Sequence, residues 1–230
     1  MQRKTTGSIM IDRPVKIPPH ALEGDLRIPS PPRGLVLFSH GSGSSRHSAR
    51  NRYVASLLQS AGFATLLMDL LTAEEEQVDL HTAQVRFNIP LLAERLVHAL
   101  DWLEEDADAG HLKIGVFGSS TGAAAALVAS TIRPSRVSAV VSRGGRPDLA
   151  GDALPHVPTP ALLIVGGNDA AVIERNRRAY ATLSASKRIE IIPDATHLFE
   201  EAGALDQVAA FALEWFRQYL SPADRAWRTA

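Results

Sequence analysis

The sequence predicts an α/β fold in which helices cover both faces of a mostly parallel central sheet. Apolar runs typical of buried strands alternate with runs typical of helices along most of the 230 residues. The runs at 35–39, 64–69 and 161–166 are almost continuously apolar, as expected for parallel strands covered on both faces. This length suits one sizeable core, so we expect residues 1–230 to form a single domain without a cap.

The N-terminal part of the chain predicts edge strands at 8–17 and 21–28. Pro14, Pro18 and Pro19 disfavour a central position for these strands because proline cannot donate a ladder hydrogen bond. The remaining expected elements, in chain order, are a strand at 35–39, a helix at 48–61, a strand at 64–69, a polar connection at 70–87, a helix at 89–105, a strand at 114–117, an alanine-rich helix up to 130, strands at 137–142 and 161–166, a helix at 170–184, a strand at 188–192 and a helix at 200–220.

Composition and charge exclude several classes of partner. The formal net charge is −1, which gives no sign of a nucleic-acid partner or an anionic membrane surface. There is no cysteine, hence no disulfide framework and no thiolate metal site. No apolar run approaches the ~20 residues of a membrane span, and the basic N-terminus lacks the apolar segment of a signal peptide. We therefore expect a cytoplasmic monomer or homodimer that acts on a small molecule and needs no cofactor.

The run KIGVFGSSTGAAAALVAS, residues 113–130, predicts a strand, a sharp turn and a helix. Its turn matches G-x-S-x-G, the pattern of a nucleophile elbow, in which a strained turn exposes the middle serine. A side chain at Gly118 or Gly122 would collide with the neighbouring strand and helix. The pattern alone is weak, but the strand-then-helix context that it requires is present. Ser120 is therefore the candidate nucleophile.

A serine hydroxyl needs a histidine base oriented by a carboxylate. Such groups belong on loops at the carboxyl ends of strands. Asp169 follows the strand at 161–166, and His197 follows the strand at 188–192. Asp169 could instead cap a helix, and His197 could be an exposed loop residue. Asp194 is a competing partner for His197, although we expect it to cap the final helix instead.

The glycine-rich loop after the strand at 35–39 is the candidate for half of an oxyanion hole. One backbone donor is expected at Thr121, directly after the nucleophile, and the other at Ser42, with Gly41 as the alternative. His40, at the start of this loop, is a further candidate for contact with the substrate. A phosphate cradle is disfavoured, because Arg46 interrupts the pattern G-x-G-x-x-G and no G-K-[ST] follows.

Two arginines are candidates for binding a substrate carboxylate. Arg143 and Arg146 follow the strand at 137–142, on the side of the sheet where the active site is expected. The alternative is ordinary surface charge or a structural ion pair with Asp148 or Asp152. No pair of histidines combines ligand spacing with a nearby carboxylate, so no metal site is predicted.

Taken together, these motifs resemble the α/β-hydrolase superfamily, and the layout without a cap resembles its dienelactone-hydrolase-like group. The resemblance spans about 15–220 and rests on the His40-Gly41 loop, the G-S-S-T-G elbow, the G-G-N-D turn and the D-A-T-H-L segment. The segments DLLTAEEE at 69–76, RF at 86–87 and AERL at 93–96 are similar to hydrolase modules found beside phosphoribosyltransferase domains. Dienelactone hydrolases proper use a cysteine nucleophile, whereas this chain has Ser120.

The resemblance implies a serine hydrolase that cleaves an ester, lactone or thioester through an acyl-serine intermediate. An acyltransferase would use the same Ser120, Asp169 and His197 but exclude water. A peptidase usually needs a wider binding platform. A non-catalytic binding module on the same fold is the alternative from another class.

Overall fold

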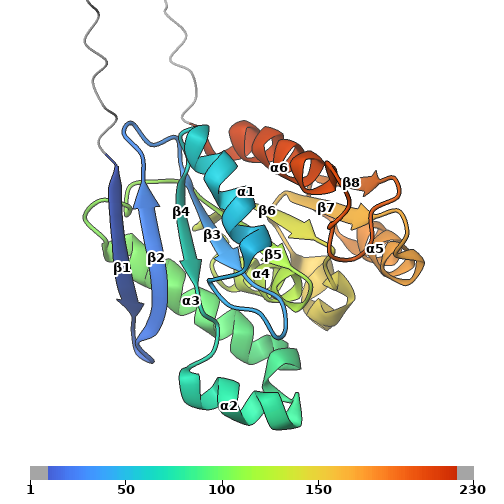
Figure 1. The fold of residues 1–230 in the computed structure, drawn as a ribbon, viewed down its shortest axis with the longest axis horizontal. Coiled ribbons are helices and arrows are strands. Elements are labelled where there is room, and N and C mark those ends of the chain that lie inside the picture. The colour runs from blue at the N-terminus through green and yellow to red at the C-terminus, as the bar shows by residue number, and fades with distance from the viewer. Residues whose placement is uncertain (1–9, 222–230) are drawn as a thin grey trace, which may run out of the picture.

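The structure, a computed structural model, describes residues 10–221 and contains one eight-stranded sheet (Figure 1). The strands are β1 (Ile11–Ile17), β2 (Leu22–Ile28), β3 (Leu35–Ser39), β4 (Ala64–Met68), β5 (Ile114–Ser119), β6 (Val137–Arg143), β7 (Ala161–Gly166) and β8 (Lys187–Ile192). Their order is β1-β2-β4-β3-β5-β6-β7-β8. The strands from β4 to β8 in this order are parallel to one another. At the edge of the sheet, β2 pairs antiparallel with both β1 and β4. The predicted fold class is therefore confirmed.

Helices cover both faces of this sheet. They are α1 (Ala49–Ser60), α2 (Ala73–Thr82), α3 (Ile89–Glu105), α4 (Thr121–Ile132), α5 (Ala170–Thr182) and α6 (Ala204–Leu220), with short 3₁₀ helices η1 (Val85–Phe87) and η2 (Pro147–His156). Helices α1 and α6 pack on one face, and α3, α4 and α5 pack on the other (Figure 1). Within residues 10–221, no helix has the length and apolarity required to cross a bilayer.

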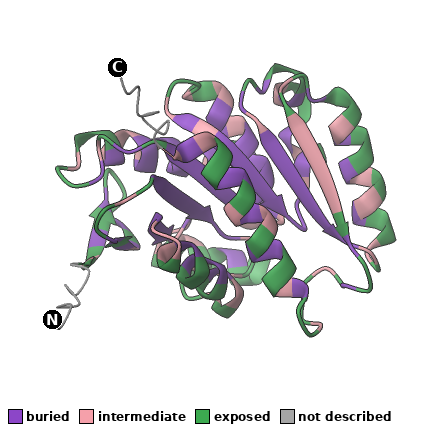
Figure 2. Ribbon diagram, turned by 90° about the horizontal axis from the view of Figure 1, so that it is seen from above, coloured by how far each residue is buried: buried purple, intermediate pink, exposed green. Residues whose placement is uncertain are grey.

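The continuous apolar runs are explained by a hydrophobic core on each face. In β3, Leu35 and Leu37 belong to the core under α3 and α4, whereas Val36 and Phe38 belong to the core under α1 and α6. Successive side chains of a strand point to opposite faces, so a strand covered on both faces needs apolar residues at every position. The central strands are accordingly buried, while the helices are exposed on their outer sides (Figure 2).

The expected polar connection at 70–87 is wrong, because this segment contains α2 and η1. Thr72 caps α2 by accepting a hydrogen bond from the Glu75 backbone, and the Glu75 carboxylate accepts one from Thr72 N at 2.8 Å. This reciprocal capping box was readable in the sequence as T-x-x-E. The other Glu75 oxygen accepts a 2.7 Å bond from Arg95 of α3, so this glutamate joins α2 to α3. The helix was missed because its polar sequence has no apolar stripe.

Two expected boundaries and one expected helix cap differ from the structure. Ser8, at the start of the first expected strand, lies outside the described residues, and β1 begins at Ile11. The last helix begins at Ala204 rather than at Glu200, after Gly203 with a φ of 76°. Asp194 is therefore too far from this helix to cap it. Its backbone carbonyl instead accepts a 2.8 Å hydrogen bond from the Asn168 side chain.

Candidate active site

The turn between β5 and α4 has the geometry expected of a nucleophile elbow. Ser120 has φ 50° and ψ −119°, a conformation that costs energy for any residue with a side chain. A Cβ on Gly118 would lie 2.5 Å from the Cα of Ala123 in α4, and one on Gly122 would lie 2.4 Å from the carbonyl oxygens of Ser39 and His40. The predicted reason for both glycines is therefore confirmed, and their absence of side chains lets strand and helix approach each other around Ser120.

Asp169 and His197 are joined by a hydrogen bond between the loops that follow β7 and β8. His197 Nδ1 donates to Asp169 Oδ2 at 2.7 Å, which leaves Nε2 as the nitrogen that can accept a proton. Asp169 Oδ1 accepts from the backbone N–H of Val172 at 3.4 Å and so caps α5. Asp169 therefore has both of the expected roles: one carboxylate oxygen caps α5, and the other accepts the hydrogen bond from His197.

One cleft brings Ser120 and His197 together with the glycine-rich loop. It has a volume of about 280 Å³. Its lining includes Gly41, Ser42, Ser120, Arg143 and His197. Gly41 packs directly against the elbow, since a Cβ there would lie 3.0 Å from the Cβ of Ser120. Thr121 N–H is the first of α4, so it has no partner within the helix. Two backbone segments with candidate N–H donors therefore border Ser120.

His40 holds the glycine-rich loop in place through both nitrogens of its ring. Nε2 accepts from the backbone N–H of Leu70 at 3.0 Å, and Nδ1 lies 2.9 Å from the carbonyl oxygen of Gly41. Burial lowers the pKa of His40, which favours the neutral ring that these two bonds require. Both ring nitrogens are therefore engaged within the protein, so contact of His40 with substrate, which stays a prediction, would be through its ring carbons.

A second, smaller pocket of about 60 Å³ is also lined by this loop. It extends from Gly41 and Thr121 to α2, where Asp79 and Leu80 contribute to the wall. Asp79 is buried, and burial alone would raise the pKa of its carboxyl group. Hydrogen bonds from the backbone and side chain of Arg86 outweigh burial, so the pKa of Asp79 is lowered. The segment at 70–87 thus borders the glycine-rich loop as a folded helix, which Arg86 of η1 holds through Asp79.

Arg143 is buried at the floor of the cleft without a carboxylate partner. Only 7% of it is exposed, and its Nε donates to Ser119 Oγ at 3.3 Å. Ser119 Oγ in turn donates to Asn51 Oδ1 at 3.1 Å, and the Arg143 guanidinium lies 5.8 Å from the centroid of the Phe199 ring. Burial, together with the nearby charge of Arg50, lowers the pKa of Arg143 to about 10. Arg143 therefore remains a cation at neutral pH.

Arg146 differs from Arg143 although only two residues separate them. Its guanidinium pairs with Asp148 through N–O distances of 2.7 Å and 2.9 Å. This is the structural ion pair that the sequence offered as the alternative to substrate binding. The same alternative is wrong for Arg143, which forms no ion pair with any described residue. Sequence reasoning also missed Ser119 and Asn51, because nothing in their local sequence marks them as partners of a buried cation.

Comparison with known proteins gives the family. The model of the Dienelactone hydrolase family matches residues 23–221. A crystal structure of a dienelactone hydrolase from Anabaena variabilis is 59% identical, with a TM-score of 0.88, and the match covers 93% of this chain and 99% of that one. A cold-adapted esterase from an Arctic intertidal metagenomic library shares the fold at 17% identity, with a TM-score of 0.70 over 96% of this chain and 97% of the other.

A curated relative from Mycobacterium tuberculosis, named "Putative phosphoribosyl transferase", is 55% identical over 202 residues. These residues are 88% of this chain but 45% of that protein, so the chain spans about half the length of the curated relatives it matches. The family match agrees with the 59% identity to the Anabaena variabilis dienelactone hydrolase, which the alignment covers almost completely. The chain belongs to the dienelactone hydrolase family and has its α/β-hydrolase fold.

Proposed function

We propose that the protein is a serine hydrolase that cleaves a carboxylic ester or lactone of a small molecule through an acyl-serine intermediate. The observation that carries this proposal is the 2.7 Å hydrogen bond from His197 Nδ1 to Asp169, with His197 and Ser120 lining the same cleft. An aspartate that fixes the tautomer of a histidine beside a serine on a strained elbow is the arrangement that activates a serine hydroxyl.

In the proposed first step, His197 Nε2 takes the hydroxyl proton as Ser120 Oγ bonds to the carbonyl carbon. The carbonyl electron pair moves onto oxygen, and the N–H groups of Thr121 and Ser42, or Gly41, donate to this oxyanion. When the carbonyl re-forms, the ester C–O bond breaks and the leaving oxygen takes the proton from His197. Water then attacks the acyl-serine with His197 as base, which releases the acid and restores Ser120.

The charge of the cleft supports a substrate with an anionic group. Arg50 and Arg143 line it, and among the residues described no carboxylate does. A guanidinium that is buried without an anion is unfavourable, whereas a substrate carboxylate would supply the missing charge and accept hydrogen bonds from it. We propose that Arg143 binds such a carboxylate while Ser120 attacks the ester of the same molecule.

Replacing Arg143 with methionine is expected to impair hydrolysis of an anionic ester selectively. The value of kcat/KM for p-nitrophenyl hemisuccinate should fall about 10–100-fold, the effect of losing a hydrogen bond to a charged group. Its value for the neutral p-nitrophenyl butyrate should change less than about threefold. The matched control is Arg146→Met, because Arg146 already pairs with Asp148 and should affect both substrates equally. Equal loss for both esters in Arg143→Met would contradict carboxylate binding.

The same variant should also be more stable than the wild type. The fall of the Arg143 pKa from its ordinary value to about 10 corresponds to a cost on the order of 3 kcal/mol. The pKa of Arg143 is lower in the folded protein than in the unfolded chain, and the guanidinium is protonated in both at pH 7. The folded protein therefore carries the full cost of burying this charge at pH 7. We expect Arg143→Met to raise the free energy of unfolding by about 1–3 kcal/mol in urea denaturation.

A partition experiment distinguishes hydrolysis from the two alternative functions, acyl transfer and non-catalytic binding. Purified protein is incubated with p-nitrophenyl butyrate and increasing methanol, and p-nitrophenol, butyrate and methyl butyrate are quantified. A hydrolase releases butyrate in water alone at the rate of p-nitrophenol. Turnover that appears only with an added alcohol indicates an acyltransferase, and lack of turnover across esters and lactones indicates a binding module.

A further inference from the structure

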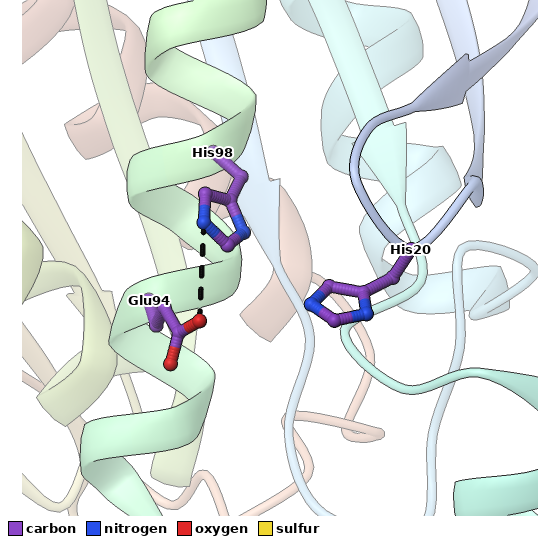
Figure 3. Close-up of side chains that lie close together, drawn as sticks. All are labelled: His20, Glu94 and His98. Atoms are coloured by element: carbon purple, nitrogen blue, oxygen red, sulfur yellow. Dashed lines mark ion pairs between the residues drawn. The ribbon is translucent and has the colours of Figure 1, made fainter.

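We propose that His20, Glu94 and His98 form a site for a divalent transition-metal ion of the zinc class, separate from the active site. Glu94 and His98 are one turn apart on α3, and His20 lies in the turn between β1 and β2. Figure 3 shows the three side chains facing one another from these two elements. None of them lines the cleft that contains Ser120, so this inference is independent of the proposed function.

The distances fit a common ion after a small movement of side chains. One ligand atom from each residue lies within 4.8 Å of the other two. Ligands on a tetrahedral zinc ion with bonds of 2.0–2.1 Å are about 3.4 Å apart, so a contraction of up to about 1.4 Å is needed. Glu94 and His20 are exposed and can rotate to provide it. The ring centroids of His20 and His98 are 5.8 Å apart, close to the about 5 Å of two imidazoles on one zinc ion.

The donor set and its surroundings favour a metal over a salt bridge. Two imidazole nitrogens and one carboxylate oxygen are a ligand combination that zinc accepts, with water in the remaining position. Glu94 Oε1 lies 3.8 Å from His98 Nε2, beyond hydrogen-bond length, and Nδ1 of His98 is buried with no partner among the described residues. The nearest arginine along α3, Arg95, is already paired with Glu75. Among residues 10–221, none of the three side chains forms a hydrogen bond, and Glu94 and His98 share only the long ion pair drawn in Figure 3.

A bound ion would cross-link the β1–β2 hairpin at the edge of the sheet to helix α3. The turn at 18–21 joins β1 to β2, and α3 packs beneath the sheet. An ion held by both elements binds the folded chain but not the unfolded one, so it stabilises the folded state by mass action. This proposal differs from the sequence-based expectation of no metal site. That expectation considered histidine spacing along the chain, whereas the turn brings His20 to α3 from far away in the sequence.

Equilibrium dialysis of the full chain against Zn²⁺, with metal analysis, tests the proposal. One ion per chain is expected, and Zn²⁺ should raise the melting temperature. His20→Ala and His98→Ala should each weaken binding at least about tenfold and abolish the rise, because each removes one of three ligands. Glu94→Gln should also weaken Zn²⁺ binding. His20 lies on an exposed turn, so His20→Ala decides the outcome if His98→Ala fails to fold.

Matched controls separate this site from other histidines and acids. His81→Ala removes an exposed helical histidine of α2, and Glu105→Gln removes an exposed glutamate of α3; neither should change Zn²⁺ affinity. His197→Ala should retain the ion, which makes the result independent of the active site. Unchanged affinity in His20→Ala, or loss of the ion in His197→Ala, would overturn the proposal.

Discussion

Replacing Ser120 with alanine is expected to lower kcat for an ester substrate by about 10³–10⁶-fold, the range seen when the nucleophile of a serine triad is removed. Without Oγ no acyl-enzyme can form, and the residual rate reflects only the oxyanion hole and substrate binding. Stability should change by less than about 0.5 kcal/mol, because alanine retains the Cβ that already occupies the strained backbone at φ 50°. Steady-state kinetics and thermal denaturation of the purified variant measure both quantities.

The matched control for this variant is Ser130→Ala. Ser130 lies on the same helix, α4, and its hydroxyl donates to the carbonyl oxygen of Leu127 at 2.7 Å. It lies outside the cleft, so kcat should remain within about twofold of the wild type. If Ser120→Ala kept wild-type turnover, another group would have to be the nucleophile and the proposed mechanism would be wrong.

Replacing Asp169 with asparagine is expected to lower kcat by about 10⁴-fold while the protein remains as stable as the wild type. The asparagine amide can donate to His197 Nδ1, which moves the ring proton to Nε2 and leaves no base for Ser120. The capping role of Asp169 should survive, because asparagine caps helices about as well as aspartate. Kinetics together with urea denaturation separate the two roles.

Two further variants sharpen this result. Asp169→Ala should lose activity to the same extent and also about 1 kcal/mol of stability, because alanine cannot accept the hydrogen bond from Val172 N. Asp194→Asn is the matched control, since Asp194 is the other acid near His197, and asparagine tolerates its φ of 60°. A large loss of kcat in Asp194→Asn with a small loss in Asp169→Asn would exchange the roles assigned to the two aspartates.

The sequence was most informative where local pattern and tertiary structure coincide. A strand such as β3 is apolar from Leu35 to Phe38 because both its faces are covered, so it could be placed from its residues alone. The order of Ser120, Asp169 and His197 along the chain predicted which loops meet at the cleft, because the carboxyl ends of parallel strands share one edge of the sheet. The hydrogen bond between Asp169 and His197 is consistent with that prediction.

Pairings between distant segments could not be predicted in the same way. Asp148 was within reach of both Arg143 and Arg146 in the sequence, and only the fold shows that it pairs with Arg146 and leaves Arg143 buried alone. Helix α2 was missed because a polar helix stabilised by a cap and by ion pairs to Arg86 and Arg95 carries no hydrophobic period. The approach of His20 to α3 likewise depends on how the edge hairpin lies against the helix.

Labelling with a fluorophosphonate probe tests the central claim, an activated Ser120, most directly. The wild-type protein is incubated with the probe and digested, and the modified peptide is identified by mass spectrometry. We predict one label per chain, on Ser120, with no label in Ser120→Ala and strongly slowed labelling in Asp169→Asn. A folded wild-type protein that takes up no probe, or takes it up at another residue, would contradict the proposed serine mechanism.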